Sequence, residues 1–165
     1  MTGKMSDEQI RAIAVTISDT RRGDDDISGV TLVGVLIANK ITVVEKVIIS
    51  DELDDIRNSL HVMTEREDVD LIVTTGGTGF SPRDNTPEAT RAVIDREAPG
   101  LSEAIRRETS RKVPMAILSR GICGIRNNTL IINFPGSPKA VKECFEVIAS
   151  VLPHAIDQIH GRSGH

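Results

Sequence analysis

Apolar residues occur along the first half of this chain in short runs that polar loops separate. The β-branched runs Ile13–Ile17 and Asp70–Thr75 predict two buried strands. Ile41–Ile49 alternates between apolar and polar residues and predicts a third strand. Between these runs, Val30–Asn39 and Asp51–Thr64 carry apolar residues at helical spacing, which predicts two helices. Asp51 and Glu52 are expected in the first turn of the second helix, where the helix dipole favours negative charge.

The second half of the chain continues the alternation of strands and helices. Thr86 followed by Pro87 predicts a helix that begins there and runs to about Glu97. Another helix is expected over Leu101–Ser110, and short strands over Met115–Ser119 and Thr129–Phe134. Ser137-Pro138 predicts the start of a last helix that ends near Gln158. Turns are expected at Gly121, Gly124 and Asn127-Asn128.

Strands that alternate with helices predict an α/β fold with a largely parallel sheet covered on both faces. The length of 165 residues favours one domain, and we expect residues 1–165 to form it with an ordered core over about 11–160. The terminal residues, to about Ser6 and from about Gly161, are expected to be loose. Hydrophobic residues make up 39% of the chain and charged residues 27%, which is typical of a globular protein.

Composition excludes several classes of function. The net charge of −4 and the absence of Trp and Tyr argue against a nucleic-acid partner. No apolar run reaches the roughly 18–20 residues of a membrane helix, and the N-terminus lacks the apolar centre of a signal peptide. We therefore expect a cytoplasmic protein with no membrane partner. Cys123 and Cys144 fit no disulfide or metal framework and are expected to be buried thiols.

The most unusual stretch is TTGGTGFSPRDNTPEAT, which starts at Thr74 and directly follows a predicted strand. A second strand leads into PGSPKA, from Pro135, in the same way. Ligands of α/β sheets bind beyond the carboxyl ends of strands, and helix N-termini attract anions. Tight turning would explain either glycine loop alone. Two such loops in one chain favour an anionic ligand, held by backbone N–H groups that glycine allows to approach closely.

The known nucleotide-binding motifs do not match these loops. No Lys follows the glycines, as the G-x-x-x-x-G-K-[ST] loop requires, and Phe80-Ser81-Pro82 interrupts the G-x-G-x-x-G pattern. No G-x-S-x-G nucleophile motif is present either. A nucleotide, if one binds, must use a different architecture.

Two acids and two arginines near the expected strand ends are candidates for phosphate chemistry. Asp51 and Asp84 would lie at neighbouring strand ends, where two carboxylates suit Mg²⁺ that bridges phosphates. The alternative is that both acids only cap helices or brace loops. Arg83 and Arg120 would pair with phosphate in bidentate fashion, or form surface ion pairs instead.

The remaining charged residues suggest less. Lys139 and Lys142 are expected to be solvated surface residues. Asp24-Asp25-Asp26 could bind a metal but is more typical of a solvated, mobile loop. None of the four His residues pairs by spacing with a Cys or an acid in a catalytic pattern, so we expect all four to be structural or exposed: His61, His154, His160 and His165.

Three segments together resemble one family: VTISDT from Val15, the TTGGTGFSPRDNTPEAT block, and the Pro135-Gly136-Ser137 loop with the sequence around it. It is the molybdenum-cofactor biosynthesis family that includes bacterial MogA and MoaB and the plant and gephyrin G domains. The likeness covers about residues 12–161. Ser50 stands where the adenylyltransferase pattern has Pro, and Asn85 where it has Val. The first loop is closer to the MoaB branch, and PRDNTPEAT is closer to the MogA branch.

The resemblance implies a three-layer α/β/α sandwich with a mostly parallel sheet and one antiparallel strand. It implies transfer of AMP from ATP to the phosphate of molybdopterin with Mg²⁺, and a homotrimer or, as a dimer of trimers, a hexamer. A molybdate-insertion enzyme is a further expected partner. A molybdopterin-binding relative without transferase activity is the alternative. Asp51 and Asp84 match the family's catalytic and metal-binding acids, and the expected substrate-binding residues are Ser18, Asp19, Ser28, Thr75, Gly76, Gly77, Thr78, Gly79, Pro82, Arg83, Ser119, Arg120, Pro135, Gly136 and Ser137.

Overall fold

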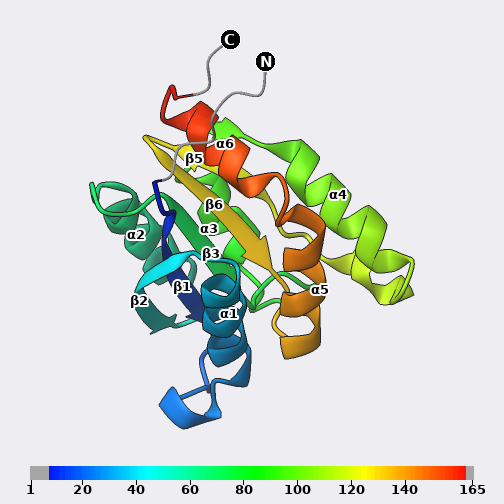
Figure 1. Cartoon of the computed structure of the whole chain (residues 1–165). Helices are drawn as coiled ribbons and strands as arrows, with labels where there is room; N and C mark the ends of the chain where they lie inside the picture. The colour runs from blue at the N-terminus through cyan, green and yellow to red at the C-terminus, as the bar shows by residue number, and fades with distance from the viewer. Residues whose placement is uncertain (1–7, 163–165) are drawn as a thin grey trace.

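A single six-stranded sheet forms the middle of the molecule, and helices cover both of its faces (Figure 1). The computed structural model describes residues 8–162. The strands lie in the order β2-β1-β3-β6-β5-β4 across the sheet. Their bounds are β1 Arg11–Ile17, β2 Thr42–Ile49, β3 Leu71–Thr75, β4 Arg96–Glu97, β5 Cys123–Arg126 and β6 Thr129–Phe134.

Five of the six strands run in one direction. β2, β1, β3 and β6 pair in parallel, whereas β5 is antiparallel to both β6 and β4. The sheet is therefore mostly parallel with one antiparallel strand, which confirms the fold class that the resemblance implies.

The helices divide into two layers (Figure 1). Those of one layer share a hydrophobic core with one sheet face, and α2 and α3 share a separate core with the other face. The first layer contains α1 Ile27–Ala38, α4 Pro99–Ser110, α5 Pro138–Ile148 and α6 Leu152–Ile159. The second contains α2 Leu53–Thr64 and α3 Thr86–Arg91, and two 3₁₀ segments, η1 Gly23–Asp25 and η2 Pro114–Leu118, lie in loops.

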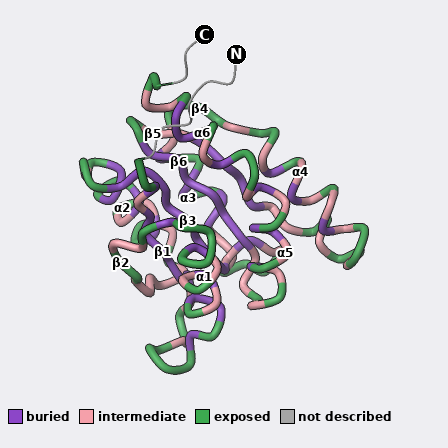
Figure 2. Tube along the Cα trace, in the orientation of Figure 1, coloured by how far each residue is buried: buried purple, intermediate pink, exposed green. Residues whose placement is uncertain are grey.

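The alternation of side chains along β1 explains why both layers form. Ala12 and Ala14 face the core beneath α1 and α5, whereas Ile13, Val15 and Ile17 face α2 and α3. All five side chains are buried, as the continuous buried path of the central strands in Figure 2 illustrates. A strand that is buried on both faces reads as an uninterrupted apolar run, which is how the sequence predicts it.

The carboxyl ends of the parallel strands lie level with one another. Thr16 of β1 pairs with Thr75 of β3, and Thr75 in turn pairs with Phe134 of β6. Ile17 pairs with Ile49 at the end of β2. The loops that follow these four strands therefore emerge along one edge of the sheet.

Most of the predicted elements are confirmed, with shifts at their ends. β1, β2, β3 and β6 match the predicted strands, and α1, α2 and α4 match predicted helices. α2 begins at Leu53 with Glu52 as its N-cap, so Asp51 and Glu52 precede its first turn rather than occupy it. Asp51 is thereby left in the loop that follows β2.

Three predicted elements are wrong. Met115–Ser119 is not a strand, because Pro114 opens the 3₁₀ segment η2 and leaves Met115 exposed. The helix predicted from Thr86 ends at Arg91, since the chain then enters β4. The last predicted helix is interrupted after Ile148 and resumes as α6.

The predictions for turns and termini had mixed outcomes. Gly124 lies within β5 rather than in a turn, whereas Asn127 has the positive φ of 51° that suits a turn. Arg162 is held by Asp157 and Glu8, although this end was expected to be loose. The expectations for residues 1–6 and 163–165 lie outside the described residues.

The acidic run also differs from its prediction at one position. Asp24 and Asp25 form the exposed segment η1, but Asp26 is fully buried at the N-terminus of α1. Its carboxylate accepts hydrogen bonds from Thr16 Oγ1 at 2.7 Å, Lys46 Nζ at 2.9 Å and the backbone N–H of Gly29 at 3.0 Å. Burial alone would raise the pKa of Asp26, but these donors hold it below its usual value. Asp26 therefore joins β1, β2 and α1.

We expect Asp26→Asn to lower the free energy of unfolding by about 2–3 kcal/mol at pH 7, because it leaves Lys46 without its buried partner. A lowered pKa contributes stability that is present above the unfolded-state value and lost on acidification. The difference from wild type should therefore shrink as the pH falls below about 4. Urea unfolding at several pH values measures it. Asp25→Asn, on the exposed neighbour, is the control and should change stability by less than about 0.5 kcal/mol.

Candidate active site

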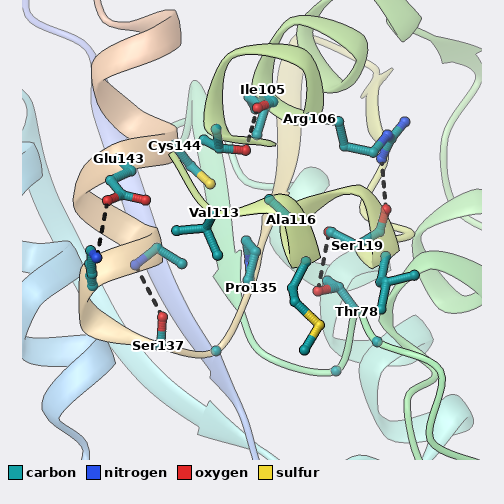
Figure 3. A pocket seen from close by; sticks show the side chains of 18 of the residues that line it. Thr78, Ile105, Arg106, Val113, Ala116, Ser119, Pro135, Ser137, Glu143 and Cys144 are labelled. Atoms are coloured by element: carbon teal, nitrogen blue, oxygen red, sulfur yellow. Dashed lines mark hydrogen bonds and ion pairs between the residues drawn. The ribbon is translucent and has the colours of Figure 1, made fainter. Parts of the chain in front are cut away.

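A pocket of about 610 Å³ opens at the sheet edge where the parallel strands end. The loops after β3 and β6 form its floor, and α4, η2 and the start of α5 form its walls (Figure 3). The walls are largely apolar, with Ile105, Val113 and Leu118 among the lining residues. The pocket therefore combines a glycine-rich floor with space for a flat organic ring.

The loop after β3 has a backbone that only glycine accommodates easily. Gly76 and Gly77 have positive φ angles of 106° and 69°. A Cβ atom on Gly76 would lie 2.4 Å from the carbonyl oxygen of Ile17, and a Cβ atom on Gly136 would lie only 3.4 Å from the Gly76 Cα. The Gly76 N–H donates to Phe134 O at 3.0 Å. Gly76 thus lets the ends of β1, β3 and β6 approach one another.

Arg120 also holds the glycine loop after β3 in place. Its backbone N–H donates to Thr78 O, its Nε to Gly79 O and its Nη2 to Asp84 O, each at 2.8 Å. Its Nη1 also forms an ion pair with Glu88. The guanidinium therefore positions the glycine loop, and its pairing with Glu88 is the ion pair that the sequence left as an alternative to phosphate binding.

The loop after β6 presents a helix N-terminus to the pocket. Ser137 is the N-cap of α5, and its Oγ accepts the N–H of Ala140 at 3.1 Å. Pro138 occupies the first helical position, where the missing N–H costs nothing. Ser137, Lys139 and Ala140 line the pocket beside Gly136. Partial positive charge at this helix end favours a phosphate.

Two hydrogen bonds join Asp19, in the loop after β1, to Asp51, in the loop after β2. The N–H of Asp19 donates to Asp51 Oδ2 at 2.9 Å, and the N–H of Asp51 donates to Asp19 Oδ1 at 3.0 Å. Burial raises the pKa of Asp51, and the negative charges of Asp19 and Asp84 add to this effect. Arg83 holds the pKa of Asp19 below its usual value. The two loops are thereby fixed side by side.

Asp84 lies at the other end of the glycine loop and lines the pocket. Its Oδ2 accepts the N–H of Ser81 at 3.0 Å and would lie 2.9 Å from a Cβ atom on Gly79. Asp51 Oδ1 would lie 3.4 Å from a Cβ atom on Gly77. The two carboxylates therefore flank the same glycine loop.

The two carboxylates fit a magnesium site that a substrate would complete. In the part of the chain that the structure describes, neither Asp51 Oδ1 nor Asp84 Oδ1 accepts a hydrogen bond, so each acid has an oxygen available. Mg²⁺ commonly binds one or two carboxylates together with phosphate oxygens and water. Over residues 8–162, no group of three or more His, Cys, Asp or Glu residues could hold a metal by itself.

The structure gathers about half of the predicted site residues at the pocket. Gly77, Thr78, Gly79, Asp84, Ser119, Pro135, Gly136 and Ser137 line it. Thr75 and Gly76 lie just beneath, where Thr75 Oγ1 donates to Pro135 O at 2.7 Å. Ser18 precedes Asp19 on the loop beside Asp51.

Other predicted residues lie away from the pocket. Arg83 pairs with Asp19 at 2.6 Å and with Glu52 at 2.7 Å, which is the surface ion pair that the sequence left as an alternative. Pro82 is exposed on the same turn. Ser28 is buried in the first turn of α1, where it accepts a hydrogen bond from Arg21.

Sequence reasoning missed the apolar side of the pocket. Lys139 and Lys142 are exposed surface residues, as predicted, but Lys139 also lines the pocket. Its position two residues after the N-cap Ser137 could have indicated that it lies beside the expected anion site. α4 and η2 are far from the glycine loops in sequence, so no local pattern could place them there. The further lining residues are Ile105, Arg106, Thr109, Val113, Met115, Ala116, Leu118, Ala140, Glu143 and Cys144.

Both cysteines are buried thiols, as predicted. Burial raises the pKa of Cys123 and of Cys144 to about 12, so neither forms a thiolate near neutral pH. Cys144 lines the pocket as an apolar side chain rather than as a nucleophile.

Comparison with known proteins identifies the family. The family profile described as "Probable molybdopterin binding domain" matches residues 9–154. The chain belongs to this family. The resemblance carried by the glycine loops is thereby confirmed.

Several relatives of this molybdopterin-binding domain are named for cofactor synthesis. The chain is 48% identical over 157 residues to the molybdenum cofactor synthesis protein cinnamon of Drosophila melanogaster, covering 92% of this chain and 26% of cinnamon. It is 48% identical over 114 residues to the molybdopterin adenylyltransferase of Helicobacter pylori J99, covering 69% and 65%. The chain thus spans about a quarter of the first relative and under two thirds of the second.

Solved structures of family members share the fold. The molybdopterin biosynthesis enzyme MoaB from Thermus thermophilus superposes with a TM-score of 0.85 at 43% identity, covering 93% of this chain and 98% of that one. The Mog protein from Mycobacterium ulcerans gives 0.84 at 41% identity, covering 93% and 99%. Within residues 8–162 of this family member, no helix has the length and apolarity needed to span a membrane.

We expect Gly76→Ala to lower the free energy of unfolding by about 2–3 kcal/mol, because a Cβ atom would meet the Ile17 carbonyl and φ would be strained. Denaturant unfolding measures the loss. Gly100→Ala is the matched control, since Gly100 lies within α4 and an added Cβ atom meets nothing within 4 Å. The control should be neutral or stabilising by about 0.5–1 kcal/mol. Equal effects of the two changes would contradict a special role for Gly76.

Proposed function

We propose that this protein is a molybdopterin adenylyltransferase, which transfers AMP from ATP to the phosphate of molybdopterin and releases pyrophosphate. The observation that carries the proposal is the glycine loop flanked by Asp51 and Asp84 beside an apolar pocket. The adenylyltransferases of Helicobacter pylori and Escherichia coli, at 48% and 42% identity, support it. A molybdopterin-binding relative without transferase activity remains the alternative.

The residues of the site suit this reaction because it needs alignment more than proton transfer. A phosphate monoester has a second pKa of about 6, so the attacking phosphate is already largely a dianion at neutral pH. One of its oxygens attacks the α-phosphorus of ATP while the bond to pyrophosphate breaks. The glycine loop and the α5 N-terminus would hold the phosphates in line through backbone N–H groups. No catalytic His, Cys or Ser is needed as a base.

Asp51 and Asp84 would hold Mg²⁺ in this proposal. The ion, when bound, supplies charge neutralisation for the phosphate oxygens. The acids themselves fix the position of the nucleotide relative to the loop. Each offers one oxygen that the described part of the protein leaves without a hydrogen-bond donor, and the mutual repulsion that helps raise the pKa of Asp51 would be relieved by a cation.

We expect Asp84→Asn to keep molybdopterin binding within about threefold of wild type while turnover falls by about 100-fold or more. The reason is that an amide cannot supply the charge that the transferring phosphates require. Product formation from ATP, Mg²⁺ and molybdopterin is measured by chromatography, and pterin binding by fluorescence.

Asp24→Asn is the control, because Asp24 lies in the exposed segment η1 away from the pocket. It should leave both quantities unchanged. Unaltered turnover in Asp84→Asn would remove that carboxylate from the mechanism. Pterin binding by the wild type without any adenylylated product would establish the alternative function instead.

We also propose that the protein forms a homotrimer, with a hexamer as the alternative. α1 contains no charged residue. Three of its apolar residues are exposed and together form one stripe along the helix. Ile27 is 64% exposed, Val30 59% and Ile37 60%. A helix that is apolar on all sides is usually buried, and such a stripe commonly marks an interface.

We expect Val30→Glu to convert the assembly to monomers, because a charge in the centre of the stripe would be desolvated on association. Light scattering after gel filtration measures the mass against the 17.9 kDa of one chain. Val62→Glu on α2 is the matched control at 65% exposure and should leave the mass unchanged. A monomeric wild type, or an intact Val30→Glu assembly, would contradict the proposed interface.

Two further expectations belong to the same proposal. The biosynthetic role of the relatives supports a cytoplasmic location. A molybdate-insertion enzyme that consumes the adenylylated pterin is a proposed partner. Its support is that the chain matches only 26% of cinnamon and 17% of gephyrin from Dictyostelium discoideum, so this domain is one part of those longer proteins.

A further inference from the structure

The apolar end of the pocket contains an acid that the proposed phosphate chemistry does not use. Glu143 lies on α5 and its side chain is only 17% exposed. Within the described residues its carboxylate accepts no hydrogen bond, and the cation paired with it, Lys139 Nζ, lies 3.9 Å away. Figure 3 shows Glu143 on the pocket wall above Ser137.

Within residues 8–162, the lack of hydrogen-bond donors distinguishes Glu143 from the buried acids Asp26 and Asp70. Asp26 accepts hydrogen bonds from three donors. Asp70, whose side chain is 6% exposed, accepts hydrogen bonds from the backbone and the guanidinium of Arg11 at 2.9 and 3.1 Å. A carboxylate that is partly removed from water without such donors lowers stability. Glu143 is therefore placed to receive donors from a ligand in the pocket.

The chemistry of a carboxylate selects between the two proposed substrates. Two adjacent oxygens match a ligand edge that carries two adjacent N–H donors. The aminopyrimidinone edge of a pterin has such a pair, N3–H and the 2-amino group. Adenine offers its 6-amino donor beside N1, which is an acceptor and would repel the second oxygen.

We propose that Glu143 binds the aminopyrimidinone edge of the pterin and makes this end of the pocket specific for it. The inference rests on the proposed function, which supplies a phosphorylated pterin as substrate. Glu143 lies six positions after the N-cap Ser137, which corresponds to about 9 Å along a helix. A pterin ring with a phosphorylated substituent spans a similar length, so its phosphate would meet the α5 N-terminus.

The side chains near Glu143 suit the faces of a flat ring. Val113 and Cys144 line the same part of the pocket, and Figure 3 shows both beside Glu143. Ile105 of α4 also lines the pocket and is buried. These residues give the ring apolar contacts on its faces, while Glu143 addresses its polar edge.

The test compares two phosphate-bearing probes that differ only at this edge. One is 6-hydroxymethylpterin phosphate, and the other is the corresponding lumazine, in which a carbonyl acceptor replaces the 2-amino donor. We expect the wild type to bind the pterin about tenfold to a hundredfold more tightly than the lumazine. Glu143→Gln should lose that preference, because an amide presents one acceptor and one donor. Binding is measured by fluorescence titration without nucleotide.

Glu146→Gln is the matched control, because Glu146 lies on the same helix, pairs with Lys112 and does not line the pocket. It should keep the wild-type preference, and thermal unfolding should show that both variants are folded. Equal affinity of the wild type for the two probes, binding of neither probe, or an unchanged preference in Glu143→Gln would overturn the inference. Failure of the proposed reaction would show itself separately, as a retained pterin preference without adenylylated product.

Discussion

The close approach of three strand ends at Gly76 is the constraint on which the site depends. β1, β3 and β6 end level with one another, and the chain must then turn in the small space between Ile17 and Phe134. Only a residue without a side chain fits there, since a Cβ atom would lie 2.4 Å from a backbone oxygen. Once Gly76 allows this turn, the loop after β3 lies against the loop after β6, and the pocket opens above them.

Electrostatic contacts then hold the loops in the arrangement that the proposed reaction needs. Asp19 and Asp51 exchange backbone-to-carboxylate hydrogen bonds, which fixes the loops after β1 and β2. Arg120 does the same for the glycine loop through three hydrogen bonds to backbone oxygens. Arg120 thereby shapes the site, and within residues 8–162 Asp51 and Asp84 each keep one carboxylate oxygen that accepts no hydrogen bond. Such a rigid cradle favours catalysis by alignment.

Local sequence patterns predict those elements whose formation depends on interactions between residues close together in the chain. The run at Ile13–Ile17 predicts β1 because a strand buried on both faces must be apolar throughout. Ser137-Pro138 predicts the start of α5 because capping is a local interaction. The strand predicted at Met115 is wrong because apolarity alone does not distinguish a strand from an exposed 3₁₀ segment beside a pocket. Glu143 shows the limit most clearly, since the pocket that it lines is completed by α4 and η2, which no pattern around Glu143 could place there.

Transfer of label from ATP to molybdopterin tests the central proposal most directly. The protein is incubated with Mg²⁺ and molybdopterin together with ATP labelled at either the α- or the γ-phosphate. We predict that the α-label enters the pterin product in a one-to-one ratio, while the γ-label leaves entirely as pyrophosphate. Appearance of the γ-label in the pterin, or binding of molybdopterin with neither label transferred, would contradict adenylyl transfer at this site.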